Sequence, residues 1–294
     1  MGEAARRHHR AGTRSARGAR RGERRAPLSV SDLAAAVILG LVQGLTEFLP
    51  VSSTAHLILV SGALGLDPEK FGLSFDVALH LGTALAVLLY FARTWIGIVV
   101  DLFRGRWRMP ALVVVGTLPA AVAGLLLEST VERTLRAPIW IVVGLIAGSI
   151  VFVVAERLAT QRQQMPQLSF ADSIVMGAAQ AIALLPGISR SGITISAGLL
   201  RGVTREDATR FSFLLATPVI LGAGLKTLLD ARKASELFAT PDVLAAGFVV
   251  SFLSGLAAGA FLVRFVRTHS LNWFVAYRLA LALAVFLILA FPRP

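Results

Sequence analysis

Two stretches of the sequence combine an apolar helical pattern with a proline and a cluster of polar residues. The first, at 43–56, reads QGLTEFLPVSSTAH, and the second, at 180–194, reads QAIALLPGISRSGIT. A charged side chain at the depth of a bilayer costs several kcal/mol unless it is paired, which makes it a candidate for a functional site. A proline stops a helix and frees backbone groups that other parts of the protein must then satisfy. The sequence therefore predicts two broken helices that face each other inside a membrane.

The composition supports a membrane location. Of the 294 residues, 55% are hydrophobic and only 16% are charged, and the mean hydropathy is +0.73. Few charges between long apolar segments are typical of a polytopic membrane protein. The chain has no cysteine, which excludes disulfides, thiol chemistry and cysteine-based zinc sites.

An arginine-rich segment precedes the apolar part of the chain. It supplies +7 of the net charge of +12, because nine arginines stand there against Glu3 and Glu23. The segment has no apolar core of a signal peptide and no helical periodicity, so residues 1–27 are predicted to be a disordered tail. An arm that binds anionic lipid or nucleic acid is the alternative, although we expect no nucleic-acid partner.

The apolar segments alternate between short and long. Six are long enough for a bilayer, which requires about 20 residues, and they lie near 75–92, 110–127, 138–155, 211–229, 243–266 and 273–291. The others form two short or interrupted pairs, at 29–49 with 52–65 and at 170–185 with 192–200. We therefore predict an all-α polytopic membrane protein with six full spans and two re-entrant helix pairs, in a single membrane domain over 28–292.

The order of these segments predicts an inverted-topology repeat. A re-entrant pair returns to its own side, and the three spans that follow it cross to the other side. The halves, at about 28–157 and 168–292, would therefore have opposite orientations, with the site near the midplane between them. Positive charges in the loops place the chain termini outside, whereas adding those of the tail reverses this orientation.

The first polar stretch carries the parts of a hydrolytic site. Gln43 and Glu47 are four residues apart and share one face of a helix, and His56 lies beyond the proline. Between them are three hydroxyl groups, those of Ser52, Ser53 and Thr54. A carboxylate, an imidazole and hydroxyls can form a base-activated nucleophile or support metal-assisted hydrolysis. The alternative is that Glu47 and His56 only satisfy local hydrogen bonds.

The second stretch has the features of an anion site. Arg190 offers a fork that suits phosphate oxygens, and the following helix would direct its positive end at the same place. Hydroxyl donors are provided by Ser189, Ser191 and Thr194. The alternative for Arg190 is a side chain that reaches the lipid headgroups.

Three other polar residues in the spans are interpreted as structural. We expect His80 to be a core histidine, and Tyr277 with Arg278 to be an anchor pair at the membrane interface.

The two polar stretches together offer an acid, a base, a nucleophile and a group of phosphate-binding residues inside a bilayer. This combination indicates a phosphorylated lipid as the substrate.

The two polar stretches, together with FDVALHLGTALAVLLYF at 75–91 and NWFVAYRLAL at 272–281, resemble the undecaprenyl-diphosphate phosphatases of the bacitracin-resistance type. The resemblance implies hydrolysis of undecaprenyl diphosphate to undecaprenyl phosphate, recycling of this carrier lipid for cell-wall synthesis, and resistance to bacitracin. It also implies a divalent cation, Mg²⁺ or Ca²⁺. The family's E/Q-x-x-x-E motif falls on Gln43 and Glu47, and the glutamine at the first position weakens any role for it as a base or an anionic metal ligand.

In this resemblance the family's histidine falls on His56, its serine pair on Ser52 and Ser53, and the arginine of its PGxSRSxxT motif on Arg190. We assign the following roles on this basis. Ser53 is the expected nucleophile and His56 the general acid and base, while Glu47 holds a metal or orients His56. Arg190 is expected to hold the diphosphate. Further substrate contacts are expected from Gln43, Ser52, Thr54, Ser189, Ser191 and Thr194. Attack by water, activated by a metal and Glu47, is the main rival to attack by Ser53.

Two other functions fit parts of the pattern. A flippase or transporter of lipid phosphates would have the same architecture. A membrane phosphatase of the acid-phosphatase type is disfavoured because residues 192–203 contain neither histidine nor aspartate. We expect a multi-pass protein of the bacterial cell membrane whose site opens to the extracytoplasmic side, and a homodimer is left open.

Overall fold

The computed structural model describes residues 31–135, 137–230, 232, 234–235 and 238–291. Over this part of the chain every regular element is a helix, and the one β-type contact is an isolated bridge between Gln163 and Val203. The all-α class is therefore confirmed. The arginine-rich tail predicted at 1–27 lies outside the described residues.

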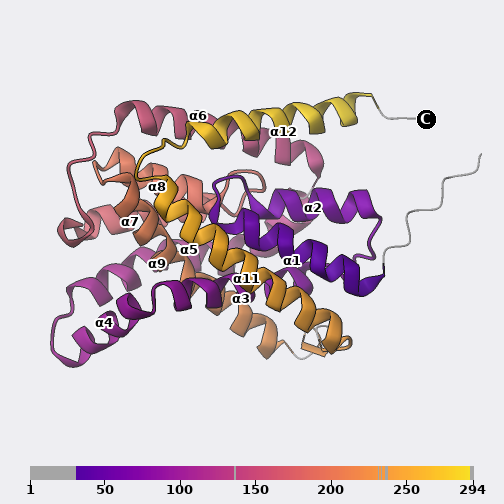
Figure 1. Cartoon of the computed structure of the whole chain (residues 1–294), viewed down its shortest axis with the longest axis horizontal. Coiled ribbons are helices and arrows are strands. Elements are labelled where there is room, and N and C mark those ends of the chain that lie inside the picture. Colours follow the sequence, from indigo (N-terminus) through magenta and orange to yellow (C-terminus); the bar gives the residue numbers. More distant parts are fainter. Residues whose placement is uncertain (1–30, 136, 231, 233, 236–237, 292–294) are drawn as a thin grey trace, which may run out of the picture.

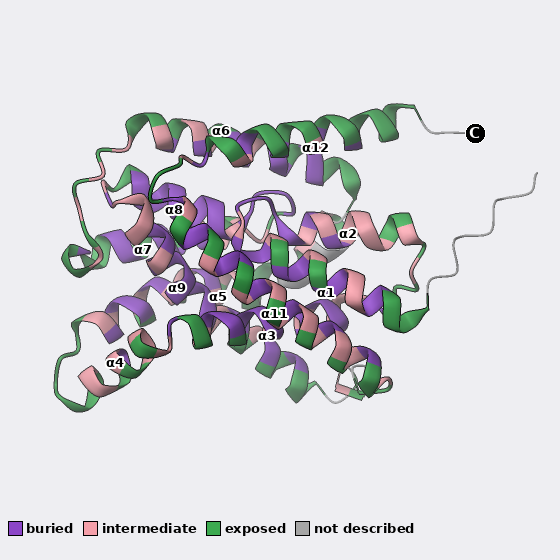
Figure 2. Cartoon of the chain, in the orientation of Figure 1, coloured by how far each residue is buried: buried purple, intermediate pink, exposed green. Residues whose placement is uncertain are grey.

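Six helices are long and apolar enough to cross a membrane. Much of the length of these helices is exposed (Figure 2). Many of the exposed side chains are large and apolar, such as those of Leu125 and Leu126, which are 70% and 71% exposed. Exposed apolar surface of this extent indicates contact with lipid, and the chain is a multi-pass membrane protein. The prediction of six spans is confirmed for α3 (Leu73–Tyr90), α5 (Arg108–Thr134), α6 (Pro138–Leu158), α9 (Arg205–Leu229), α11 (Pro241–Phe265) and α12 (Asn272–Ala290).

Four shorter helices form the two predicted pairs, α1 (Asp32–Phe48) with α2 (Ser53–Leu64) and α7 (Phe170–Ile182) with α8 (Arg190–Leu200). The Ser31 side chain accepts a hydrogen bond of 3.3 Å from the Ala34 amide and caps α1, as the sequence predicts. Helix α1 ends at Phe48, with Leu49 between it and Pro50, and α7 ends at Ile182, before Pro186. The insertion of these pairs from one side of a membrane stays a prediction.

The sequence did not predict α4 (Ala92–Phe103) as a separate helix. Only Phe91 separates it from α3, and no glycine or proline marks the boundary. Ile96 and Phe103 of α4 are 63% and 85% exposed. A single 3₁₀ turn, η1 (Met165–Gln167), lies in the connection between the two halves.

The first helix of each half packs against a long helix of the other half (Figure 1). Between α1 and α11, a Cβ atom on Gly44 would lie 2.0 Å from Ser254 Oγ. Between α7 and α5, a Cβ on Gly177 would lie 2.0 Å from the carbonyl oxygen of Gly116. Small residues thus let the backbones of each pair approach closely. This reciprocal packing is what a two-fold repeat requires, while the inverted orientation of the halves stays a prediction.

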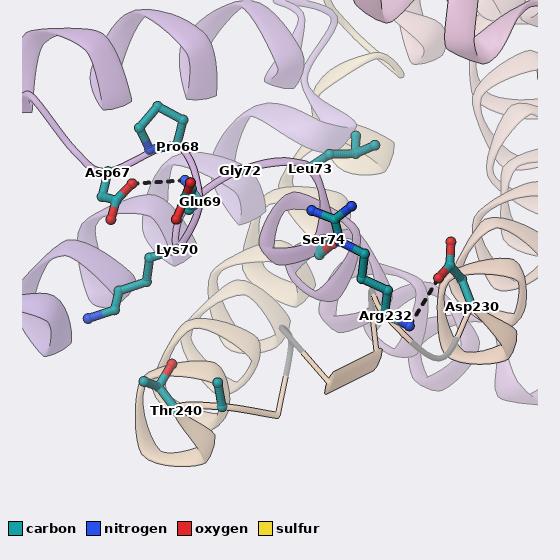
Figure 3. A pocket seen from close by; sticks show the side chains of 11 residues that line it. Asp67, Pro68, Glu69, Lys70, Gly72, Leu73, Ser74, Asp230, Arg232 and Thr240 are labelled. Atoms are coloured by element: carbon teal, nitrogen blue, oxygen red, sulfur yellow. Dashed lines mark hydrogen bonds between the residues drawn. The ribbon is translucent and has the colours of Figure 1, made fainter.

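An open pocket of about 720 Å³ lies where the connection from α2 to α3 meets the chain between α9 and α11 (Figure 3). Its polar lining includes Asp67, Lys70 and Asp230. None of the residues that the sequence predicts as site residues lines it.

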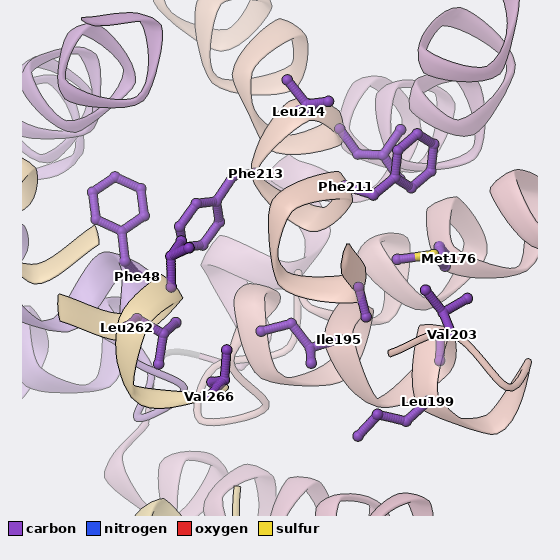
Figure 4. Packing of buried hydrophobic residues seen from close by; sticks show 14 of the residues in the cluster. Phe48, Met176, Ile195, Leu199, Val203, Phe211, Phe213, Leu214, Leu262 and Val266 are labelled. Carbon is purple, nitrogen blue, oxygen red and sulfur yellow. The ribbon is translucent and has the colours of Figure 1, made fainter. Parts of the chain in front are cut away.

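A buried aromatic cluster fixes the end of α1 against α9 (Figure 4). The rings of Phe48 and Phe213 have centroids 4.9 Å apart, and the ring of Phe91 lies 6.1 Å from Phe213. Because Phe48 is the last residue of α1, this packing holds the preceding residue, Glu47, at a defined place in the protein interior.

Candidate active site

The break between α1 and α2 and the break between α7 and α8 have similar backbone conformations. The similarity lies at the residue that directly precedes the second helix of each pair. Ser52 has φ 75° and ψ 95°, and Ser189 has φ 75° and ψ 110°. Among the described residues only one other non-glycine residue, Gln161, has positive φ. Such conformations cost roughly 1–3 kcal/mol each and cluster at functional sites. They place Ser53 and Arg190 in equivalent positions, as the first residues of α2 and α8.

Polar contacts join the two breaks. The Gly187 amide donates a hydrogen bond of 3.2 Å to Ser52 Oγ, and Arg190 Nη2 donates one to Glu47 Oε1. Ser191 Oγ lies 3.4 Å from the carbonyl oxygen of Leu49. The structure therefore brings together the two polar stretches that the sequence predicts to face each other.

Glu47 is the centre of this arrangement and is only 6% exposed. Its Oε2 accepts hydrogen bonds from Ser53 Oγ at 2.6 Å and from Gln43 Nε2 at 3.0 Å. His80 Nε2 lies 3.3 Å from the same oxygen, while Oε1 is paired with Arg190. The Ser53 hydroxyl therefore directs its hydrogen at a carboxylate, which can take the proton when the oxygen attacks an electrophile.

A cavity of about 270 Å³ adjoins these groups. Glu47, Ser53, His80 and Arg190 line it together with three further predicted residues, Ser52, Thr54 and Ser189. Arg190 Nη1 is buried without a hydrogen-bond partner, so the guanidinium has a donor to offer to a bound anion.

A second, mainly apolar cavity of about 410 Å³ lies between α5 and α9 and the end of α7. It shares wall residues with the first cavity, so the two cavities are neighbours. The shared residues are Gln180, Ala183, Leu184, Arg190, Val219 and Ala223.

This site lies within a segment that matches a known family. Residues 36–284 match the family described as Bacitracin resistance protein BacA. The chain belongs to the BacA family. An undecaprenyl-diphosphatase of Desulforudis audaxviator is 46% identical to it over 256 residues, which cover 86% of this chain and 96% of the relative. An undecaprenyl-diphosphatase of Rubrobacter xylanophilus is 44% identical over 264 residues, with 86% of this chain and 97% of the relative covered. One of Corynebacterium diphtheriae is 44% identical over 266 residues, with 86% and 93% covered.

The structure corrects the interpretation of His80 in this BacA family protein. His80 is not an isolated core histidine, because its ring lines the polar cavity and approaches Glu47. Its Nδ1 lies 2.7 Å from the carbonyl oxygen of Asp76, which can only accept, so Nδ1 carries a hydrogen. Nε2 faces the Glu47 carboxylate, and it stabilises that carboxylate when it carries a hydrogen too. A lone histidine inside an apolar span is itself the signal that could have identified it.

His56 is placed differently from the sequence-based expectation. Its Nδ1 donates to the carbonyl oxygen of Ser52 at 2.7 Å, and Tyr277 Oη lies 2.7 Å from Nε2. These two contacts turn the ring toward α12, and His56 lines neither of the two cavities. The structure therefore does not bring His56 into hydrogen-bond contact with Glu47 or Ser53.

Several of the remaining predicted residues are also buried at the site. Gln43 Oε1 and Thr194 Oγ1 are buried without a hydrogen-bond partner, as is Gln180 Oε1. Ser189 Oγ accepts from the Gly192 amide at 3.3 Å and lies 3.3 Å from Ser191 Oγ. Gln180 was not singled out from the sequence, although it lines both cavities.

The groups around Glu47 do not fit a resident metal ion. Glu47 is the one carboxylate that lines the polar cavity, and its oxygens already contact Arg190, Gln43, Ser53 and His80. In the described part of the chain no three His, Cys, Asp or Glu residues form a cluster that could hold an ion. A guanidinium at the carboxylate also disfavours a divalent cation at the same oxygens.

Arg278 differs from the expected interface anchor. Tyr277 is 48% exposed, but Arg278 has no exposed surface. Neighbouring residues on a helix point in directions about 100° apart. The prediction that both residues lie at the membrane interface is therefore wrong for Arg278. Arg278 points into the protein, where it contacts both breaks.

Proposed function

We propose that this protein hydrolyses undecaprenyl diphosphate to undecaprenyl phosphate and inorganic phosphate, which recycles the carrier lipid of cell-wall synthesis and confers resistance to bacitracin. The observation that carries the proposal is the cavity lined by Ser53, Glu47 and Arg190, which adjoins a mainly apolar cavity. This combination suits a lipid with a diphosphate head. Membership of the BacA family supports the same activity.

The two cavities divide the substrate between them. The diphosphate would enter the polar cavity, where Arg190 Nη1 lacks a partner. The isoprenoid chain would continue into the cavity between α5 and α9, whose lining is mainly apolar. An isoprenoid chain has no polar groups that need hydrogen bonds, so it can lie among apolar side chains at membrane depth.

We propose that Ser53 Oγ attacks the terminal phosphorus and transfers its proton to Glu47. The bond between that phosphorus and the bridging oxygen then breaks, undecaprenyl phosphate leaves, and a phosphoseryl group remains. Water hydrolyses the phosphoserine to regenerate Ser53 and release phosphate. In the resting state Arg190 is paired with Glu47, so phosphate oxygens that bind Arg190 would weaken this pair and make the carboxylate a better base.

The histidines have different proposed roles. His80 holds the orientation of Glu47 through its contact with Oε2. His56 makes no hydrogen bond to Glu47 or Ser53 through which it could act as their general acid or base. We propose that it holds the start of α2 in place through its hydrogen bond to the Ser52 carbonyl oxygen. Attack by activated water on the phosphorus is the rival route.

The phosphate groups of the substrate offer a divalent cation better ligands than the side chains of the cavity do. Phosphate oxygens are good ligands for Mg²⁺ and Ca²⁺, and Glu47 is the one carboxylate on the cavity wall. We propose that the cation enters with the diphosphate. We further propose that the site opens to the extracytoplasmic side of a bacterial cell membrane, with no nucleic-acid partner, while a homodimer stays open.

The test is release of inorganic phosphate from undecaprenyl diphosphate by purified protein reconstituted in lipid. Arg190→Ala is the inactive control, because it removes the phosphate fork. Arg264→Ala is the matched control, because Arg264 is exposed at the end of α11. A flippase would release no phosphate from any lipid, and that outcome would overturn the proposed hydrolysis.

A further inference from the structure

We infer that Arg278 is a positioning residue, which holds the two broken helices at the separation that hydrolysis requires. The inference rests on the proposed function. Arg278 lies in α12, is fully buried and lines neither the polar nor the apolar cavity. It therefore acts on the substrate through other residues.

The guanidinium of Arg278 connects the two breaks directly. Its Nη1 donates a hydrogen bond of 3.3 Å to the carbonyl oxygen of Pro50, and its Nη2 donates one of 2.8 Å to that of Gly187. Pro50 lies just before Ser53, and Gly187 lies just before Arg190. One rigid planar group thus sets the distance between the segments that carry the nucleophile and the phosphate fork.

Helix α6 provides a fixed base for this group. Arg278 Nε donates to Ser149 Oγ at 3.0 Å, and Nη2 also lies 3.0 Å from the Leu145 carbonyl oxygen and 3.2 Å from that of Gly144. The ring of Phe152 lies 4.6 Å from Cζ, a cation–π contact.

Helix α6 is also shaped to admit the guanidinium. A Cβ atom on Gly148 would lie 2.3 Å from Nη2 and 2.7 Å from the Ile188 carbonyl oxygen. Any side chain at this position would push Arg278 or the second break out of place. The glycine therefore leaves room for a group that holds both breaks.

The acceptors around Arg278 argue against a role in the stability of the fold alone. All five are neutral oxygens, and none of these contacts involves a carboxylate. A buried charge without an opposite charge costs more than an apolar side chain of the same size. A guanidinium holds several donors in one fixed plane, whereas lysine has a single ammonium group on a flexible chain.

The test compares Arg278→Lys with Arg264→Lys, which keeps the charge at an exposed position of α11. We expect kcat for undecaprenyl diphosphate to fall at least about 30-fold in Arg278→Lys, because a misplacement of reacting groups by about 1 Å can cost roughly 100-fold. KM and the melting temperature should change little, and the control should match wild type. A kcat within about threefold of wild type, or a loss that follows the loss of folded protein, would overturn the inference.

A second pair of variants tests the same inference while Arg278 itself is left unchanged. Ser149→Ala deletes one acceptor of Arg278 on α6, and Ser52→Ala deletes the direct bond to Gly187. Both act on the separation of the same breaks, so we expect their effects on kcat to be non-additive. Additive effects, or no effect of Ser149→Ala, would overturn the inference even if Arg278→Lys does not fold. Wild-type protein that releases no phosphate would instead overturn the proposed function.

Discussion

Ser53 Oγ donates a hydrogen bond of 2.6 Å to Glu47 Oε2, across the break between α1 and α2. The break places the hydroxyl at the first residue of α2 and the carboxylate at the last turn of α1. A hydroxyl held in this way is oriented for proton transfer before the substrate binds.

The first prediction distinguishes serine attack from water attack. If Ser53 is the nucleophile, Ser53→Ala should abolish phosphate release, and a phosphoseryl group should be trapped on wild-type protein by rapid quenching. If water attacks, the variant should lose only a hydrogen bond to a charged group, worth about 1.5–3 kcal/mol or a roughly ten- to hundredfold drop in kcat. Residual turnover in that range, without a phosphoprotein, would support water.

The second prediction concerns Arg190, which pairs with Glu47 and has a free buried Nη1. Arg190→Ala should abolish turnover, because the guanidinium that is expected to hold the phosphate is lost. Arg190→Lys should raise KM and retain a trace of activity, since lysine offers one point charge in place of a planar fork. Steady-state kinetics with both variants checks this, and near-native activity in Arg190→Ala would exclude the assigned role.

The third prediction compares the two histidines. His80→Ala should lower kcat by about ten- to hundredfold, because it removes a partner of the catalytic carboxylate. His56→Ala should cost less than about tenfold, because the ring reaches the site only through the Ser52 carbonyl. Measured kcat values under saturating lipid decide between them. Near-complete loss in His56→Ala alone would return the acid–base role to His56.

The fourth prediction concerns acid stability. Burial would raise the pKa of Asp172, but hydrogen bonds from Ser169, Arg201 and Gln163 outweigh it and lower the pKa from 3.8 to about 2. Asp172 therefore stabilises the fold above pH 3.8, and this contribution is lost as the pH falls toward 2. Melting temperatures in detergent should fall over this range for wild type and less for Asp172→Asn. Asp67→Asn, at an exposed position, should behave like wild type.

The fifth prediction concerns the arginine-rich tail. Deletion of residues 1–26 should leave the specific activity unchanged, because that segment has few apolar residues to pack with. Phosphate release per folded protein is the measurement. Lower activity at unchanged expression would show that the tail contributes to function.

Sequence patterns determined the architecture well because their causes are local. The length of each apolar segment predicts whether it can cross a bilayer. Pro50 and Pro186 follow the ends of α1 and α7, although Pro119 and Pro218 lie inside α5 and α9. The boundary at Phe91 was missed for the same reason, since no residue there stops a helix. Local chemistry also identified Glu47, Ser53 and Arg190 as members of one site.

Only the tertiary structure decided which side chains meet. His80 and His56 are both histidines in apolar helices, and only the packing of α3 against α1 turns His80 toward Glu47. Arg278 follows Tyr277 directly, yet one is buried and the other exposed. Side-chain direction depends on how a helix is rotated against its neighbours, and that rotation is set by contacts between residues far apart in the chain. Sequence therefore determined the helices and the chemistry available, while helix packing determined the site.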